Sequence, residues 1–298
     1  MVVSVACRIL CTPRAGAARS SDCLCPACQL DWEAATGPLS GGPHARHEGH
    51  VIGSTLRRTL STSAVLSALA LTACSGSDDD EPTFEERGYP DAPAQEIPES
   101  RASDAEPVAS SPIAELAEDQ WIDDTAGETG VPARAVAAYA GASLRLQQTH
   151  PECEIGWNTL AGIGQVESLH GHHGDSSLDE DGVVSPPIIG VPLDGSEDVM
   201  EIPDTDDGAL DGDPVWDRAV GPMQFIPETW TLYAEDGNLD GETDPQQIDD
   251  AALTAAVYLC SVGEDITEDE QWNAAISAYN QSLPYVQDVA DHAASYAE

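Results

Sequence analysis

The second half of the chain repeats apolar and polar positions at helical spacing. From about Val131 onward, apolar side chains return every three or four residues, which is the period of one face of an α-helix. Pro132 suits the first turn of the first such segment, because proline lacks the N–H group that a helix start leaves unpaired. The pattern predicts helices over residues 131–148, 155–169, 227–234, 247–262, 269–280 and 283–297.

Two stretches interrupt this pattern. Residues 171–217 are rich in Gly, Pro and Asp and contain only short apolar runs such as "PPIIGVPL", so we expect a long irregular loop region with room for a small β-hairpin. Residues 75–130 are rich in Ser, Pro and acids, which predicts a disordered acidic linker. The expected fold class is therefore mainly α, with one domain over residues 131–298.

Residues 51–74 have the proportions of a signal peptide. Two arginines are followed by an uncharged, largely apolar run that is too short for a comfortable membrane span. The run ends in Leu71-Thr72-Ala73-Cys74, which resembles the bacterial lipobox, in which the cysteine is lipidated and becomes the mature N-terminus. We therefore expect lipidation at Cys74, with a simple secretion signal as the alternative.

Residues 1–50 are unexpected ahead of a signal peptide. They contain five cysteines and three histidines, but the cysteine spacings lack the paired C-x2-C units that indicate a zinc site. The preferred interpretation is an upstream extension, with the true start near Val51.

The charge is strongly one-sided. The chain has 54 acidic residues against 11 basic ones, all of them arginine, and a formal net charge of −43. Such a surface repels polyanions, so nucleic acid is excluded as a partner. It is typical of a highly solvated exported protein and carries no information on the fold.

Cys153 and Cys260 are the two cysteines of the predicted domain. In an exported protein such a pair most often forms a disulfide. The bond would join the start of the 155–169 helix to the end of the 247–262 helix. Two free buried thiols are the alternative.

Glu167 interrupts an apolar stretch. No acid occurs from Ile155 to Val166, and Trp157, Leu160 and Ile163 fall on or near the face that carries Glu167. A carboxyl group on an apolar face loses hydration, which raises its pKa and lets it act as a general acid near neutral pH. Taken alone, a rim-exposed glutamate at a helix end is the commoner case.

Three motifs follow one another along the chain: "LAGIGQVESLHG" (160–171), "AVGPMQFIPETW" (219–230) and "AAISAYNQS" (274–282). Together they resemble the lytic murein transglycosylases of the family B type, and the second is similar to that family's G-x-x-Q-F-x-P-S-x-[WY] signature. "LAGIGQVESLHG" (160–171) is similar to its glutamate helix, and "AAISAYNQS" (274–282) to its A-x-x-S-Y-N element. The resemblance implies a lysozyme-like domain in an exported lipoprotein of actinobacterial style.

The resemblance also implies the chemistry. Glu167 would be the sole catalytic acid, cleaving the MurNAc–GlcNAc β-1,4 bond of peptidoglycan with formation of 1,6-anhydro-MurNAc. Gln224, Tyr279 and Asn280 would bind the glycan, Gln224 through an amide that both donates and accepts. Met223, Phe225 and Trp230 are expected in the core. The alternatives are a hydrolytic muramidase and a non-catalytic peptidoglycan-binding lipoprotein.

"DGNLDGETDPQQIDD" (236–250) has the spacing of a calcium loop. Oxygen-bearing side chains occupy its first, third and fifth positions, and Gly241 occupies the sixth, as in an EF-hand. Gln247 replaces the usual bidentate glutamate at position 12. The predicted ligands are Asp236, Asn238, Asp240, the Glu242 carbonyl and Asp250, as in family B enzymes that bind calcium; a solvated acidic turn is the alternative.

The remaining expectations follow from these. The three histidines of "HGHHG" (170–174) are expected to line a loop or the substrate cleft rather than bind a metal. No organic cofactor is expected. The protein is expected to be a monomer that acts on peptidoglycan strands, exported to the cell envelope and held by a lipid anchor on the outer face of the cytoplasmic membrane.

Overall fold

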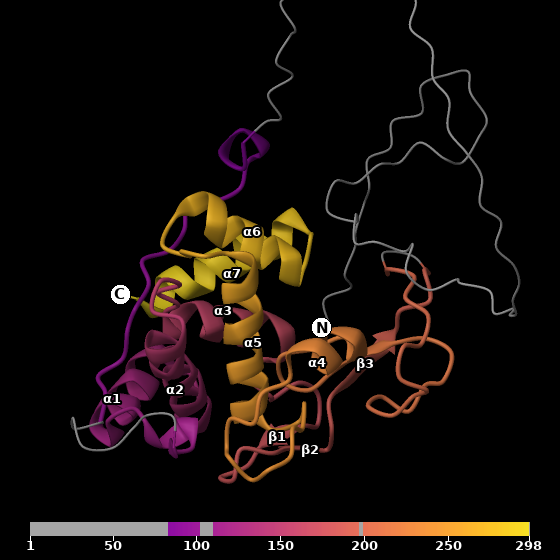
Figure 1. The fold of residues 1–298 in the computed structure, drawn as a ribbon, viewed down its shortest axis with the longest axis horizontal. Helices are drawn as coiled ribbons and strands as arrows, with labels where there is room; N and C mark the ends of the chain where they lie inside the picture. The colour runs from indigo at the N-terminus through magenta and orange to yellow at the C-terminus, as the bar shows by residue number, and fades with distance from the viewer. Residues whose placement is uncertain (1–82, 102–109, 197–198, 298) are drawn as a thin grey trace, which may run out of the picture. The chain divides into compact units, whose positions relative to one another are not determined.

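A computed structural model describes residues 83–101, 110–196 and 199–297 (Figure 1). Its α-helices are α1 (Asp119–Thr129), α2 (Ala133–Thr149), α3 (Trp157–Ser168), α4 (Pro227–Tyr233), α5 (Ile248–Val262), α6 (Asp269–Tyr279) and α7 (Leu283–Tyr296). Two 3-10 helices, η3 (Glu85–Arg87) and η5 (Ile113–Glu115), precede them. Within the described ranges, no helix combines the length and apolar character needed to cross a membrane.

The six helices predicted from the apolar pattern are confirmed. Each of them, α2 to α7, begins and ends within two residues of the predicted range. Pro132 is the N-cap residue of α2 and so stands just before the first turn instead of inside it. The mainly α fold class is confirmed as well.

The predicted disordered linker is wrong over residues 110–130. Helix α1 and η5 occupy most of this range, and Ile113, Leu116, Ala117 and Ile122 are buried against the other helices. Many acids in this range lie on the exposed side of these elements. The average composition is therefore acidic, although a few apolar residues are enough to pack the segment against the domain. The predicted signal peptide, the predicted lipidation site Cys74 and residues 1–50 lie outside the described residues.

Residues 94–96 were also predicted to belong to the disordered linker. Instead, they form an extended segment that packs against the domain. The Glu96 N–H donates to Asn158 Oδ1 at 2.9 Å, and the Trp157 N–H donates to the Glu96 carbonyl at 3.0 Å. The Asn158 amide in turn donates to the carbonyls of Ala94 and Ala293. A buried asparagine thus joins this segment, the first turn of α3 and the end of α7.

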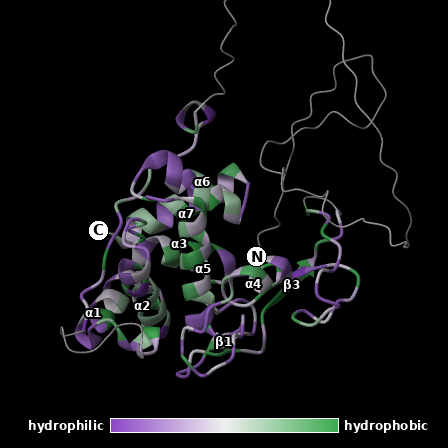
Figure 2. Cartoon of the chain, viewed as in Figure 1, coloured by the Kyte–Doolittle hydropathy of each residue, from purple (hydrophilic) through white to green (hydrophobic). Residues whose placement is uncertain are grey.

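Helix α3 lies at the centre of the packing that matters for function. It packs against α7 and α2, while α2 and α6 pack against α5 (Figure 1). Gly162 permits the close approach of α3 and α7, because a Cβ there would lie 2.8 Å from the Val289 carbonyl oxygen. Figure 2 shows α5 as a largely hydrophobic helix, in keeping with its buried alanines and leucines.

The 171–218 region is irregular with two short strand pairs. Strand β1 (Ser177–Leu178) pairs antiparallel with β2 (Val184–Ser185). Strand β3 (Ile189–Pro192) pairs antiparallel with β4 (Arg218–Val220), placing Ile189 opposite Val220. The chain between β3 and β4 forms a long excursion on the opposite side of the domain from α1 (Figure 1).

The structure contains the expected disulfide between Cys153 and Cys260, which are 107 residues apart. The Ile266 N–H also donates to the Cys153 carbonyl, at 3.1 Å. The bond therefore joins the turn before α3 to the last turn of α5 and leaves α3 fixed at its start.

Candidate active site

Glu167 lies in the last turn of α3 and faces a cleft. Trp157, Leu160 and Ile163 of the same helix are fully buried, so the apolar face predicted for Glu167 is the face that packs into the core. Burial raises the pKa of the Glu167 carboxyl from its ordinary 4.5 to about 7. The group can therefore carry a proton near neutral pH.

Tyr285 is the partner of this carboxyl. Its hydroxyl donates to Glu167 Oε1 at 2.6 Å from the first turn of α7, and the bond favours the charged form of Glu167, against the larger effect of burial. Sequence reasoning missed Tyr285. The available signal was a tyrosine on the apolar face of α7, beside Val286 and Val289, because the hydroxyl of a buried tyrosine requires a polar partner.

Gln224 stands in a tight turn between β4 and α4. Val220 and Phe225 exchange backbone hydrogen bonds of 2.9 Å in both directions, and Gln224 adopts a φ of 48°. Its amide nitrogen donates to the Gly221 carbonyl at 3.0 Å. Among the described residues no group donates to Gln224 Oε1, although that atom is buried. The side chain lines the cleft, and its Oε1 is a buried acceptor left free.

Tyr279 and Asn280 also border the cleft, at the end of α6. The Tyr279 hydroxyl donates to the Met223 carbonyl at 2.7 Å, which ties α6 to the Gln224 turn. The hydroxyl that is hydrogen-bonded to Glu167 is that of Tyr285; burial, followed by the nearby Glu167 charge, raises the pKa of Tyr279. Asn280 is the C-cap residue of α6, and its Oδ1 accepts the Ser282 N–H at 3.0 Å just before α7.

The opposite wall of the cleft is aliphatic and comes from the β3–β4 region. Together with Glu167 and the motif residues, it encloses about 160 Å³. The sequence predicted an irregular loop region with room for a small β-hairpin over residues 171–217, and the absence of periodicity there gave no sign of a cleft wall. The wall residues are Val191, Leu193, Val199, Met200 and Ile202.

The expected core residues and histidines are also placed. Met223, Phe225 and Trp230 are buried, as predicted. His170 does not line the cleft: it is buried behind α3, with Nδ1 3.2 Å from the Tyr139 hydroxyl and Nε2 3.4 Å from that of Tyr296. Burial, followed by the charges of His172 and His292, lowers the His170 pKa to about 3. His170 is therefore neutral.

The predicted calcium loop forms a turn closed by its own acids. Asp236 accepts the backbone N–H groups of Asp240 and Gly241, at 3.2 and 2.9 Å. Asp250 reaches across from α5 to accept those of Gly237 and Asp244, at 2.8 and 2.9 Å. Burial, with a smaller contribution from the nearby Asp236 charge, raises the Asp250 pKa to about 6 against the lowering effect of its backbone hydrogen bonds. The turn therefore gathers oxygen donors around a buried carboxyl.

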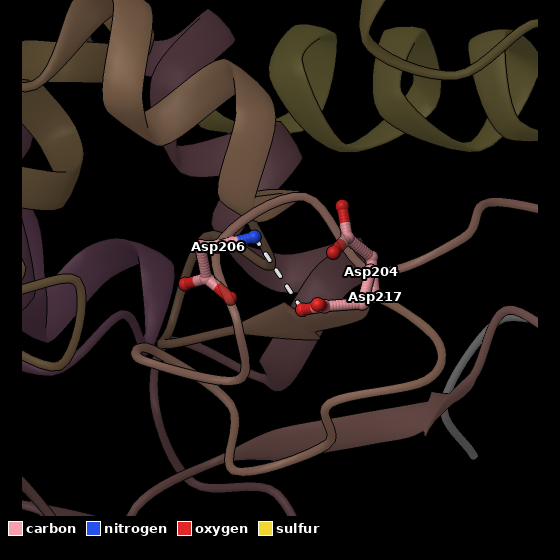
Figure 3. Close-up of side chains that lie close together, drawn as sticks. All are labelled: Asp204, Asp206 and Asp217. Atoms are coloured by element: carbon pink, nitrogen blue, oxygen red, sulfur yellow. Dashed lines mark hydrogen bonds between the residues drawn. The ribbon is translucent and has the colours of Figure 1, made fainter.

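A different set of acids converges more closely. Asp204, Asp206 and Asp217 have carboxylate oxygens within 4.8 Å of one another, and Figure 3 shows the three side chains around one loop. Asp217 is satisfied within this loop, since it accepts the Thr205 N–H and hydroxyl at 2.8 Å each. Among the described residues, the acids of 236–250 do not include three whose carboxylate oxygens all lie within 4.8 Å of one another. No sequence motif assigns a role to the 204–217 set, and its hydrogen bonds account for its geometry as a loop closure.

One protein family matches part of the described domain. Residues 211–295 match the family described as Transglycosylase SLT domain, a range that includes Gln224, Tyr279 and Asn280 and begins after Glu167. The expected enzyme class, a peptidoglycan lytic transglycosylase, is thereby confirmed. Among curated proteins, none matches the chain.

Solved structures of lytic transglycosylases are similar at low identity. Escherichia coli SLT35 in complex with bulgecin A is 13% identical, with 68% of this chain and 96% of that chain covered and a TM-score of 0.37. Escherichia coli SLT35 in complex with calcium is also 13% identical, with 68% of this chain and 96% of that chain covered and a TM-score of 0.36. SltB3 from Pseudomonas aeruginosa, in complex with NAG-anhNAM-pentapeptide, is 15% identical over 67% of this chain and 68% of that chain, with a TM-score of 0.36.

Proposed function

We propose that this enzyme cleaves the MurNAc–GlcNAc β-1,4 bond of peptidoglycan without water, leaving 1,6-anhydro-MurNAc, with Glu167 as acid and base. One observation carries the proposal. Among the described residues that line the cleft, Glu167 is the only carboxylate. Glycosidases that use water or a covalent intermediate usually need two carboxyl groups at set separations, so the arrangement favours internal attack by the substrate.

The residues support each step of such a reaction. The protonated Glu167, whose pKa is about 7, gives its proton to the glycosidic oxygen as the bond to C1 breaks. The resulting carboxylate, held by the Tyr285 hydroxyl, then accepts the proton of the C6 hydroxyl as that oxygen attacks C1. Bond breaking and ring closure thus return Glu167 to its starting form.

The cleft also suits an N-acetyl sugar. The free acceptor Gln224 Oε1 matches the N–H of an N-acetyl group, which loses its hydration on entering the cleft. Tyr279 and Asn280 border the same space with an aromatic ring and an amide. The substrate's acetyl oxygen can stabilise C1, so a second protein carboxylate is not required.

Mass spectrometry of digested glycan tests the proposal. Purified glycan strands incubated with the enzyme should yield anhydro ends. Reducing ends would instead establish a hydrolytic muramidase, which is the first alternative. Binding without cleavage would establish a non-catalytic peptidoglycan-binding protein, and either result would overturn the proposal.

Calcium is proposed as a structural ion of the 236–250 turn, in the manner of family B enzymes. The donor set consists of carboxylate and amide oxygens, which are the ligands that calcium prefers. The backbone hydrogen bonds to Asp236 and Asp250 leave acceptor capacity on both, since each ionised carboxylate has about four lone-pair sites. Asn238, Asp240 and the Glu242 carbonyl would complete the site.

Export and anchoring are proposed from the sequence alone. Cys74 would carry the lipid on the outer face of the cytoplasmic membrane, and the acidic residues after it would connect it to a monomeric catalytic domain. Cys74→Ser should move the protein from the membrane fraction to the soluble fraction. Unchanged fractionation of this variant would contradict the anchor.

A further inference from the structure

We infer that the cleft selects muramyl units whose lactyl group is an uncharged amide over units whose lactyl group is a free carboxylate. The inference rests on the proposed function and concerns the substrate class of the same site. The lactyl group is attached to C3 of the ring whose C1 reacts at Glu167, so it enters the same cleft. Its charge therefore depends on whether a stem peptide, or another amide, caps it.

The wall facing Glu167 offers nothing to a carboxylate. It consists of the aliphatic side chains of the β3–β4 region, and the only ionisable lining groups among the described residues are Glu167 and Tyr279. A carboxylate placed against these aliphatic side chains would lose hydration without gaining a cation, which is strongly unfavourable. An amide has a smaller desolvation cost and no net charge.

Acids stand directly beside this wall. Asp194 follows the wall residue Leu193, and Glu201 lies between the wall residues Met200 and Ile202. Asp194 and Glu201 pair with each other in an isolated antiparallel β-bridge. The bridge holds both residues next to the wall residues that adjoin them in sequence. Their negative charge, added to that of the whole chain, opposes a second carboxylate.

The arginines of the described region are all engaged elsewhere. Three form ion pairs with aspartates, in the pairs Arg101–Asp119, Arg134–Asp249 and Arg218–Asp213. Arg145 donates to the Ser111 carbonyl at 2.6 Å, and Arg87 lies over the Phe84 ring. The chain contains no lysine. Within the described domain, no arginine is therefore available to bind the lactyl carboxylate.

Two synthetic substrates isolate the charge. A GlcNAc–MurNAc oligomer with free lactyl carboxylates is compared with the same oligomer carrying lactyl methylamides, at one pH and one ionic strength. We expect kcat/KM to favour the methylamide by about tenfold, equivalent to about 1.4 kcal/mol. Equal rates, or a preference for the carboxylate, would overturn the inference while leaving the proposed function intact. If neither oligomer is cleaved, the proposed function itself fails, and the inference with it.

A cation in the wall should change the preference. Val191 lines the cleft and is 47% exposed, so Val191→Arg adds a guanidinium there without requiring its burial. This variant should cleave the carboxylate oligomer faster and reduce the preference at least about threefold. An unchanged preference would show that the wall does not select.

Val215→Arg is the matched control. Val215 is 59% exposed in the same β3–β4 region but does not line the cleft, and the substitution changes the net charge equally. It should leave the ratio of the two rates at the wild-type value. An equal effect of both variants would assign the selection to the overall charge and would overturn the role of the cleft.

Discussion

At the scale of single residues, the properties of Glu167 follow from two opposing contacts. Its aliphatic surroundings favour the protonated acid, while the Tyr285 hydroxyl favours the carboxylate. A side chain that must both give and accept a proton benefits from this balance, because its pKa then lies near neutral pH.

Glu167→Gln should abolish cleavage and stabilise the fold at high pH. The amide has no proton to give, so activity should fall at least about a hundredfold. The raised pKa means that the folded state holds a proton which the unfolded state releases between about pH 4.5 and 7, so wild-type stability declines through that window. Calorimetry should therefore find a higher Tm for the variant at pH 8 and little difference at pH 4. A lower Tm at pH 8 would contradict the burial of the charge.

Tyr285→Phe should move the upper pH limit of activity. Removing the hydroxyl removes a bond to the charged form, so the pKa of Glu167 should rise and the alkaline fall in kcat/KM should shift upward by about one unit. Tyr296→Phe, on the same helix but away from Glu167, is the control and should leave the pH profile in place. A profile that is identical in both variants would show that the hydroxyl does not tune the acid.

At the scale of elements, the turns around the helices carry the site. The end of α6 and the Gln224 turn are joined through the Tyr279 hydroxyl, and α5 is joined to the 236–250 turn through Asp250. Helix α5 thus connects the predicted calcium loop to the core, and α6 connects the core to the cleft.

Calcium should raise the Tm through the 236–250 turn. An ion that binds only the folded state stabilises it by about 2.7 kcal/mol at a hundredfold excess over its Kd. Asp236→Ala with Asp240→Ala should remove this response at fixed ionic strength. Asp204→Ala with Asp206→Ala removes two acids from the tighter cluster and should leave the response unchanged. The site would be ruled out if calcium shifted the wild type no more than the first variant.

The disulfide should contribute stability without contributing to catalysis. Loop-closure entropy for a bond between residues this far apart predicts a contribution of up to about 4–5 kcal/mol. Cys153→Ala with Cys260→Ala should lower the urea midpoint and the Tm, yet keep kcat/KM well below the new Tm, because neither cysteine lines the cleft. Unfolding curves measured beside the wild type would show the loss, and an unchanged midpoint would contradict it.

At the scale of the whole molecule, the excess of acids acts on stability. A net charge of −43 makes the folded chain repel itself, and the repulsion falls as salt shortens the range of each charge.

Monovalent salt should therefore stabilise the protein. With a chelator present, raising NaCl from about 0.05 to about 0.5 M should increase the Tm, because screening weakens like-charge repulsion more in the compact state. Choline chloride should have a similar effect, which separates screening from binding of sodium. A flat or falling Tm in both salts would show that self-repulsion does not limit stability.

The sequence by itself determined the helices and drew attention to Glu167. Helices α2 to α7 depend on local periodicity. Glu167 stood out because one acid interrupts an apolar face, but its proposed catalytic role came from the three motifs that resemble the transglycosylases. The Cys153–Cys260 pair was also readable, since few pairings were possible. In contrast, the acidic average over residues 110–130 concealed Ile113 and Ile122, because a short helix needs only a few apolar anchors to dock.

Only the tertiary structure decided what surrounds the acid. Tyr285 lies 118 residues from Glu167 and reaches it because Gly162 lets α7 approach α3 closely. The aliphatic wall comes from a segment without periodicity, whose position depends on the pairing of β3 with β4. Local patterns report which face of an element is apolar, whereas contacts between distant segments depend on how those faces pack, and that packing determines the pKa of Glu167 and the chemistry of the cleft.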